Sequence, residues 1–312
     1  MARSVAWTRR DVWTRKLLYP GHTLPTAAAP VIVGAGLAVH DRVFSPLPMA
    51  LAFLAGWLIQ FAGVVTDNRT NLVLQPDDEE HPELVQALAS GSLSLAGLRT
   101  AILACYGLAL LLGLVLFAIA GWPVIVIGIA SMVASWAYST GPFPFGRHGL
   151  GDPLFFLFFG TVSVVGTYYV QAAAVLGAAQ WRSALPLTAV AVSLPIGALI
   201  TGILVIDDIR DCAFDRVKGK RTIAVRFGKD RSRLEFTALV GLAYLAPLWV
   251  WRGWGFSGWV LLPLLTLPLA ALMTRLLWST DDSRELVPMT PRMAALTVAY
   301  ALCWAVGIAL RA

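Results

Sequence analysis

Long apolar runs, each close to the length of a membrane-crossing helix, recur along the whole sequence. A spanning helix needs about 20 mostly apolar residues. Every backbone group in lipid must be satisfied internally, which leaves helices and closed barrels, and barrel strands would read as short alternating segments. The sequence therefore predicts an all-α membrane protein, a bundle of nine transmembrane helices. The runs lie near 23–40, 47–66, 96–120, 122–138, 153–176, 183–206, 235–251, 257–278 and 292–310.

Composition supports residence in lipid. The chain has 312 residues, of which 58% are hydrophobic and 13% are charged, whereas about a quarter of the residues of a soluble domain are charged. So few charged residues cannot cover a surface of this size in water. The net charge of +6 belongs to the loops and indicates membrane orientation, so we expect no nucleic-acid partner.

Basic residues divide unequally between the two sides that nine spans define. Twenty of the 24 lie on the side of the N-terminus, and four lie opposite, at Arg42, Arg182, Arg252 and Arg311. Lys and Arg concentrate on the cytoplasmic side of membrane proteins. We therefore expect a multi-pass protein of the cell membrane, with a cytoplasmic N-terminus and the C-terminus outside. We expect a single domain over 1–312. Its residues 1–21 would form a basic cytoplasmic segment before the first helix.

The long polar loops all fall on the predicted cytoplasmic side, at 67–95, 139–152 and 207–234. Long ordered loops in compact proteins usually carry function. The predicted bundle should accordingly have a polar cavity on its cytoplasmic side.

The 207–234 loop begins with an unusual concentration of carboxylates. Asp207, Asp211 and Asp215 are spaced to stack on one face if the sixth helix continues inward, with Asp208 beside them. Like charges at this spacing require a cation, and Mg²⁺ prefers oxygen ligands that it bridges to substrate phosphates. The basic residues that follow are suited to the other side of a diphosphate. A solvated helix with salt bridges is the alternative. These basic residues are Lys218, Lys220 and Arg221.

Another acidic segment, the first of the two along the chain, follows the second apolar run. Asp67 and Asn71 are one helical turn apart, with Asn68 beside them, and Asp77 follows Pro76. Carboxylate and amide oxygens both ligate Mg²⁺. A capped helix end followed by an acidic loop explains this segment about as well.

The loop between the fourth and fifth runs, YSTGPFPFGRHGLGD at 138–152, is rich in glycine and proline, which force a compact backbone. Arg147 on this loop is placed to meet a carboxylate or a phosphate, although a simple interhelical turn is the alternative. Together with the two acidic segments, the loop suggests a reaction on an allylic diphosphate with a lipid tail. Metal binding would make the diphosphate a better leaving group. Aromatic residues of the fifth run would surround the allylic cation. The alternative is that these residues only pack against neighbouring helices.

Several of these segments resemble the UbiA superfamily of intramembrane aromatic prenyltransferases, and within it the 1,4-dihydroxy-2-naphthoate polyprenyltransferases of menaquinone synthesis. The similarity extends from residue 22 to about 228. It is carried by HTLPTAAAPVIVGAG at 22–36, by GPFPFG with RHGLGDPLFFLFFGTVSVVGTYYVQ at 147–171, and by DDIRDCAFDRVKGKRTIAVRFG. The resemblance implies transfer of a polyprenyl group from its diphosphate to a dihydroxynaphthoate with loss of the ring carboxylate, giving demethylmenaquinone, with Mg²⁺ as cofactor.

The resemblance also assigns roles. The partners it implies are a polyprenyl diphosphate, an aromatic acceptor such as 1,4-dihydroxy-2-naphthoate, and the lipid bilayer. The expected catalytic residues are Asp67, Asp208, Asp211, Arg147 and Tyr138. The expected diphosphate-binding residues are Lys218, Lys220, Arg221 and Arg210. The expected metal ligands are Asp67, Asn68, Asn71, Asp77, Asp207, Asp208, Asp211 and Asp215.

The first acidic segment departs from the family pattern, which runs roughly Asn-Asp-x-x-Asp-x-x-x-Gly-x-Asp. Here the first two positions are exchanged, as Asp67 and Asn68, and the third is the amide Asn71. The site thus has one carboxylate fewer, which leaves open a different phenolic or quinone-precursor acceptor. A membrane transporter is the alternative from another class. Transporters place charge near the bilayer midplane, whereas here it gathers at one face.

Overall fold

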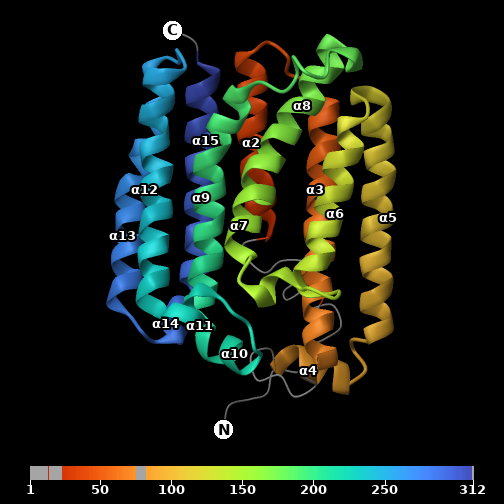
Figure 1. The fold of residues 1–312 in the computed structure, drawn as a ribbon, viewed down its shortest axis with the longest axis vertical. Coiled ribbons are helices and arrows are strands. Elements are labelled where there is room, and N and C mark those ends of the chain that lie inside the picture. The colour runs from red at the N-terminus through yellow and green to blue at the C-terminus, as the bar shows by residue number, and fades with distance from the viewer. Residues whose placement is uncertain (1–12, 14–22, 75–81, 311–312) are drawn as a thin grey trace.

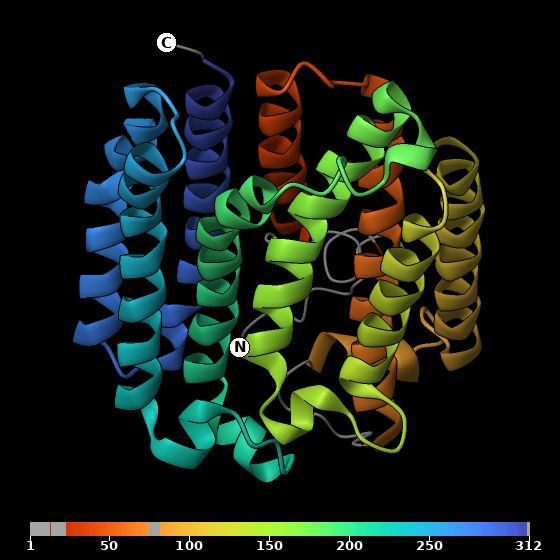
Figure 2. The ribbon, with the colours of Figure 1, turned by 45° about the horizontal axis from the view of Figure 1, so that its top comes forward.

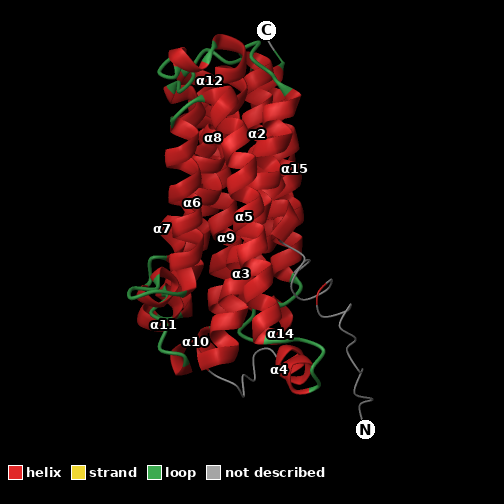
Figure 3. Ribbon diagram, turned by 90° about the vertical axis from the view of Figure 1, so that its right-hand side faces the viewer, coloured by secondary structure: helices red, strands yellow, loops and turns green. Residues whose placement is uncertain are grey.

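The computed structural model describes residues 13, 23–74 and 82–310, and they form a bundle of helices with no strand in these ranges (Figures 1 and 3). Long helices run along the bundle, and short ones lie near its two ends. The helices are α2 (Thr23–His40), α3 (Pro46–Leu74), α4 (Pro82–Ala89), α5 (Leu95–Ala120), α6 (Pro123–Ser139), η2 (Phe145–His148), α7 (Gly151–Phe155), η3 (Phe156–Val162), α8 (Ser163–Leu176), η4 (Ala178–Gln180), α9 (Leu187–Arg210), α10 (Cys212–Val217), α11 (Ile223–Phe227), α12 (Lys229–Gly253), η5 (Gly258–Thr266), α13 (Leu267–Ser279), α14 (Ser283–Leu286) and α15 (Met289–Ala309).

Within the described ranges, eight helical stretches are long and apolar enough to cross a membrane, so the chain is a multi-pass membrane protein. The fourth predicted run forms α6, which is apolar but has only 17 residues. Every predicted run is therefore helical, while the number of nine spans stays a prediction. The basic segment predicted at 1–21 lies outside the described residues, except for Trp13.

The helix α9 lies inside the bundle, between α12 and α15 on one side and α7, η3 and α8 on the other (Figure 2). In an apolar stretch of 18 residues within α9, 83% of the residues are buried, against 17% in the corresponding stretch of α5. Leucines of α5 are correspondingly exposed, among them Leu103 and Leu111. An exposed apolar face is suited to contact with the hydrocarbon chains of lipids, which are themselves apolar.

Small residues allow the helices to approach closely around α9. A Cβ atom added to Gly160 of η3 would lie 2.3 Å from the Cα atom of Gly197 on α9. Small residues of this kind let backbones in membrane proteins pack in direct contact. The element η3 is a π-helix within the apolar stretch, and such π-turns often occur beside functional sites.

The short helices α4, α10, α11 and α14 gather at one end of the bundle, together with η2 (Figure 1). We call this the loop-rich end. It contains the described parts of all three long loops that the sequence predicts to be functional. The connections at the opposite end, such as 41–45 between α2 and α3, are short.

Candidate active site

A cavity of about 550 Å³ lies between α2, α3, α5, α6, the stretch from α7 to α8, and α9. Apolar and aromatic side chains line most of it, and polar side chains gather where it meets the loop-rich end. Three stretches that are distant in sequence supply that polar part: the end of α3, the stretch from the end of α6 to the loop before α7, and the stretch from the end of α9 through α10 to Thr222. The polar residues there are Asp67, Asn68, Asn71, Tyr138, Ser139, Arg147, Asp207, Asp208, Arg210, Asp211, Asp215, Lys220 and Thr222.

The first acidic segment lies on α3 itself, because this helix continues to Leu74, beyond the end of the predicted apolar run. The helical turn brings Asn71 against Asp67, and Asn71 Nδ2 donates a hydrogen bond of 3.2 Å to Asp67 Oδ2. Ser139, at the end of α6, donates one of 2.6 Å to Asp67 Oδ1. Asn68 lines the cavity and donates from Nδ2 to the Val64 carbonyl at 2.9 Å, which leaves its side-chain oxygen available.

At the end of α9, a single guanidinium joins two carboxylates. Arg210 donates from Nε to Asp211 Oδ1 at 2.7 Å and from Nη2 to Asp211 Oδ2 at 2.5 Å, a bidentate pair. Its Nη1 pairs with Asp207. Thr290 at the start of α15 donates to Asp207 Oδ1 at 2.6 Å. Fork geometry of this kind fixes both position and orientation, so Arg210 holds the two carboxylates in place.

The predicted continuous helix through the second acidic segment is wrong at one position. The helix α9 ends at Arg210, Asp211 adopts φ −94° and ψ 7°, and α10 starts at Cys212. Asp211 and Asp215 nevertheless donate backbone hydrogen bonds four residues back, at 2.8 Å each. The carboxylates therefore follow a helical path with a bend at Asp211, where the chain leaves the apolar environment of the bundle.

Asp208 and Asp215 differ in their surroundings. Asp215 is 1% exposed and forms an ion pair of 2.7 Å with Lys220 Nζ. Asp208 lines the cavity and makes no hydrogen bond or ion pair with any described residue. Since an unpaired carboxylate in a poorly hydrated site is unfavourable, Asp208 is the carboxylate on α9 most in need of a cation.

The loop before α7 is tied to the loop that follows α10. The backbone nitrogen of Arg221 donates to the Arg147 carbonyl at 3.0 Å. Gly149 lies beside this contact with φ +76°, and a Cβ atom there would lie 2.5 Å from the Arg221 carbonyl oxygen. A glycine is required at such a position for both reasons. The contact holds the backbone of Arg147 in place where this residue lines the cavity.

Most of the predicted site residues meet at this cavity. Lys218 and Arg221 are the exceptions among the described residues, because they do not line it, and Arg221 is exposed. Asp77 lies outside the described residues. The predicted residues that line the cavity are Asp67, Asn68, Asn71, Tyr138, Arg147, Asp207, Asp208, Arg210, Asp211, Asp215 and Lys220.

Comparison with known proteins decides the family. The model of the UbiA prenyltransferase family matches residues 27–297. The chain belongs to this family. Among its relatives is the 1,4-dihydroxy-2-naphthoate octaprenyltransferase of Mycobacterium tuberculosis, 30% identical over 92% of both chains. The enzyme of that name from Escherichia coli is 30% identical over 96% of both.

Solved structures of UbiA homologues share the fold. The apo structure of the homologue from Aeropyrum pernix aligns with a TM-score of 0.68 and 17% identity, over 88% of this chain and 96% of that one. The homologue from Archaeoglobus fulgidus bound to DMAPP and Mg²⁺ aligns with a TM-score of 0.58 and 16% identity, over 91% of this chain and 96% of that one. At this identity the likeness shows that the UbiA bundle is common to these chains.

The oxygen donors of this UbiA protein are of the kind that Mg²⁺ prefers. Among the described residues, however, no three His, Cys, Asp or Glu side chains form a ready cluster for a metal. Mg²⁺ commonly takes one or two carboxylates, with substrate phosphates and water completing its shell. The separate carboxylates Asp67 and Asp208 fit that manner of binding, in which diphosphate and metal arrive together.

Ser139 and Thr290 take part in the site but were not expected from the sequence. Ser139 stands next to Tyr138 in the glycine-rich loop segment, so its neighbourhood was a usable signal. Thr290 is 83 residues from Asp207, and nothing in the sequence pairs them. Gln60 and Thr26 form a further polar contact on the cavity wall, with Gln60 Nε2 2.6 Å from Thr26 Oγ1.

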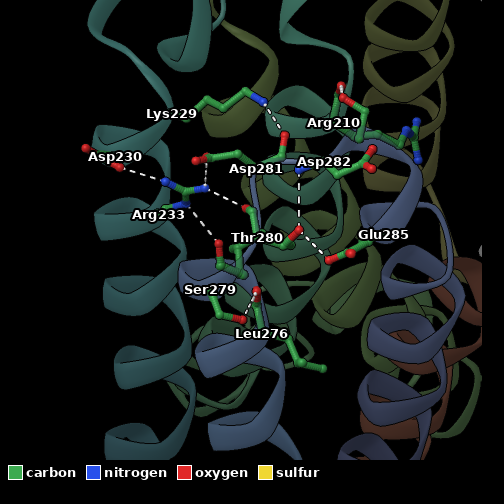
Figure 4. A network of polar contacts seen from close by, with 12 residues as sticks. Arg210, Lys229, Asp230, Arg233, Leu276, Ser279, Thr280, Asp281, Asp282 and Glu285 are labelled. Carbon is green, nitrogen blue, oxygen red and sulfur yellow. Dashed lines mark hydrogen bonds and ion pairs between the residues drawn. The ribbon is translucent and has the colours of Figure 1, made fainter.

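A separate polar network joins α12 to the connection between α13 and α14 (Figure 4). Arg233 is 6% exposed and donates to the carbonyls of Leu277 and Thr280, at 2.8 and 2.7 Å, near the end of α13. It also pairs with Asp230 and Asp281, at 2.7 and 2.6 Å. The hydrogen bond and charge of Arg233 hold the pKa of Asp281 below its ordinary value. None of the residues that bond to Arg233 lines the cavity, so we assign the Arg233 contacts a structural role.

Proposed function

We propose that this protein transfers a polyprenyl group from a polyprenyl diphosphate to 1,4-dihydroxy-2-naphthoate with loss of the ring carboxylate, giving the reduced quinol form of demethylmenaquinone. The observation that carries the proposal is the cavity itself. Its walls are apolar and suit an isoprenoid chain, and its polar end joins both acidic segments to Arg147 and Lys220. The names of the relatives that match over nearly the whole chain support the naphthoate as acceptor. The activity would reside in one domain over 1–312.

We assign the diphosphate to the polar end of the cavity. Lys220 and Arg147 line that end and would compensate the charge of the phosphates. The proposed set of diphosphate-binding residues also includes Lys218 and Arg221, from the adjoining segment. Arg210 completes the set, and it would bind the diphosphate after leaving its ion pairs with Asp207 and Asp211. Asp67, Asn68, Asn71, Asp207, Asp208, Asp211 and Asp215 are the proposed metal ligands, with Asp77 beyond the described residues.

When bound, Mg²⁺ would supply charge stabilisation to the departing diphosphate. The residues of the chain would bind and orient the two substrates for the following bond changes. The carbon–oxygen bond to the diphosphate breaks, and a carbon–carbon bond forms at the ring carbon that carries the carboxylate. That carboxylate leaves as CO₂, and its bonding electron pair restores the aromatic ring. Tyr138 and Phe155, whose ring centroids are 5.6 Å apart, would present aromatic faces to the allylic cation.

A different phenolic or quinone-precursor acceptor is the second candidate. The observation that favours it is the neutral Asn71, hydrogen-bonded to Asp67 where the family pattern has a carboxylate. We further propose a location in the cell membrane with nine spans. The N-terminus and the cavity mouth would face the cytoplasm, and the C-terminus would lie outside, as the distribution of basic residues suggests.

The decisive experiment offers the protein, purified in detergent, a polyprenyl diphosphate and a panel of aromatic acceptors with and without Mg²⁺. We expect prenylation and decarboxylation of 1,4-dihydroxy-2-naphthoate, abolished by chelation of divalent ions. Transfer to another acceptor alone would favour the second candidate. The proposal would be overturned if the protein transferred the prenyl group to none of the acceptors while a cooperative unfolding transition showed that it was folded. Arg231→Gln, on the surface of α12 and away from the cavity, is the control variant.

A further inference from the structure

The wall that α2 and α3 contribute to the cavity carries an amide whose hydrogen-bonding capacity is mostly unused. Gln60 lines the cavity, and its one hydrogen bond to a described residue runs from Nε2 to Thr26 Oγ1 at 2.6 Å. Its carbonyl oxygen Oε1 is buried and has no donor among the described residues. A side-chain amide can make four hydrogen bonds, and an unpaired buried carbonyl costs free energy.

The orientation of this amide follows from the hydrogen-bonding of Thr26. The Thr26 hydroxyl donates its hydrogen to the Thr23 carbonyl at 3.0 Å. Its oxygen is therefore left to accept, and only the NH₂ group of Gln60 can donate to it. The contact consequently fixes which end of the amide faces Thr26, and it leaves Oε1 as the group that needs a donor.

The position of Gln60 relates it to the diphosphate end of the cavity. Gln60 and Asp67 both line the cavity from α3. They are seven residues apart, which is two helical turns on the same face and about 10 Å along the axis. The amide thus lies deeper in the bundle than the acidic segment, roughly one fused aromatic ring system away from it.

The chemistry of the two proposed substrates decides which of them this amide suits. Beyond its diphosphate, an isoprenoid chain has no hydrogen-bonding group, so a polar amide deep in the cavity disfavours it. A hydroxylated naphthoate has hydroxyl donors on its ring. Apolar residues of α5 and α6, such as Leu110, Leu114 and Ile129, line the cavity as well and suit the chain.

We propose that Gln60, held by Thr26, accepts a hydrogen bond from a ring hydroxyl of the aromatic acceptor and thereby places the ring against the wall formed by α2 and α3. The inference rests on the proposed function and adds the subsite for the acceptor. It makes Gln60 a specificity-determining residue, because a site built to hydrogen-bond a hydroxyl discriminates against the analogue that lacks it.

The test compares 1,4-dihydroxy-2-naphthoate with 1-hydroxy-2-naphthoate and 4-hydroxy-2-naphthoate, each lacking one hydroxyl. We expect Gln60→Leu to raise KM for the diol by on the order of tenfold and to leave KM for the polyprenyl diphosphate unchanged. The variant should also lose the preference of the native protein for the diol over one of the two analogues. Thr26→Val, which removes the anchor of the amide, should weaken the same preference.

Ser131→Ala is the matched control, since Ser131 is another polar residue on the cavity wall, contributed by α6; it should leave the preference intact. Binding of the diol without diphosphate, measured by calorimetry, gives a readout independent of turnover. Equal effects of Gln60→Leu on both substrates, or an undiminished preference in Gln60→Leu or in a folded Thr26→Val protein, would overturn the inference. Failure of the native protein to prenylate any hydroxynaphthoate would instead overturn the proposed function.

Discussion

The two neighbouring carboxylates Asp207 and Asp208 have opposite environments at the scale of single residues. Asp207 is held by Arg210 and Thr290, whereas Asp208 faces the cavity without a partner among the described residues. We expect Asp208→Asn to reduce transfer at least about a hundredfold, because it removes an electrostatic contact to the reacting centre. Asp207→Asn should cost less activity and instead lower the free energy of unfolding by about 1–3 kcal/mol. Turnover, and thermal unfolding in detergent, would separate these roles. Equal losses of activity in both variants would contradict them.

A second prediction at the residue scale concerns the pair on α3. Asp67→Asn keeps the size of the side chain and removes its charge, so the Mg²⁺ concentration needed for half-maximal transfer should rise sharply. Asn71→Asp places a second carboxylate 4 residues from Asp67, where the mutual repulsion is relieved by a cation. The Mg²⁺ requirement should then fall or stay the same. Magnesium titrations of activity and of thermal stability would measure both. If Asp67→Asn is silent while Asp77→Asn is lethal, the first metal site lies in the loop after Pro76.

The sequence predicted the proximity of Asp67 and Asn71 because both lie on one helix, where spacing determines contact. It could not predict the contact of Asp207 with Thr290 or of Asp67 with Ser139. Those pairs lie on different helices, and their meeting depends on how the helices pack. Arg210 was expected to bind diphosphate, and its pairing with Asp207 and Asp211 became visible only in the folded chain.

Among the elements, the crossing of η3 with α9 is the closest fit that we describe. Gly160→Ala would place its Cβ atom 2.3 Å from the Gly197 Cα atom, so the helices must separate. We expect a loss of about 1–3 kcal/mol in the free energy of unfolding and reduced activity, since η3 lines the cavity. Gly107→Ala on α5 is the matched control, because no atom lies within 4 Å of the added Cβ. It should be neutral or slightly stabilising. A native-like unfolding transition in Gly160→Ala would show that the crossing is looser than described.

The Arg233 network is the second device at the scale of elements. Arg233→Gln should lower the free energy of unfolding by about 1–3 kcal/mol, because carbonyls near the end of α13 lose their donor. Asp281 is exposed, so its ion pair with Arg233 should contribute little to the free energy of unfolding. Because the folded pKa of Asp281 is lowered, that contribution is present above its ordinary pKa of about 4 and is lost as the pH falls through the lowered value. Thermal unfolding against pH measures this, with Arg231→Gln as the control. If both variants unfold alike, the network does not stabilise the protein.

Helix positions could be predicted because apolar runs of this length have few alternatives in lipid. The π-helix in η3 and the bend at Asp211 could not. Each is a local departure from the regular α-helix at a place of close contact: Gly160 of η3 lies against α9, and Arg210 is hydrogen-bonded to Asp211 at the bend.

For the whole molecule, we predict that the loop-rich end faces the cytoplasm. With the three native cysteines replaced, a cysteine at Val217, which is 83% exposed at the loop-rich end, should react with an impermeant reagent only from the cytoplasmic side. A cysteine at Ala179, exposed at the opposite end, should react only from outside. Labelling of Val217→Cys from outside in intact cells would reverse the proposed topology.

The shortness of α6 has a consequence for the surrounding bilayer. Its 17 residues span about 26 Å, less than the hydrocarbon thickness of about 30 Å. In the proposed arrangement of nine spans, in which α6 crosses the membrane, the bilayer beside α6 would thin to match it. Since Tyr138 and Ser139 at the end of α6 line the polar end of the cavity, this local dimple would bring the head-group layer toward that end. A diphosphate carried at the surface by its lipid tail would then have a shorter descent at this side of the bundle than elsewhere around it.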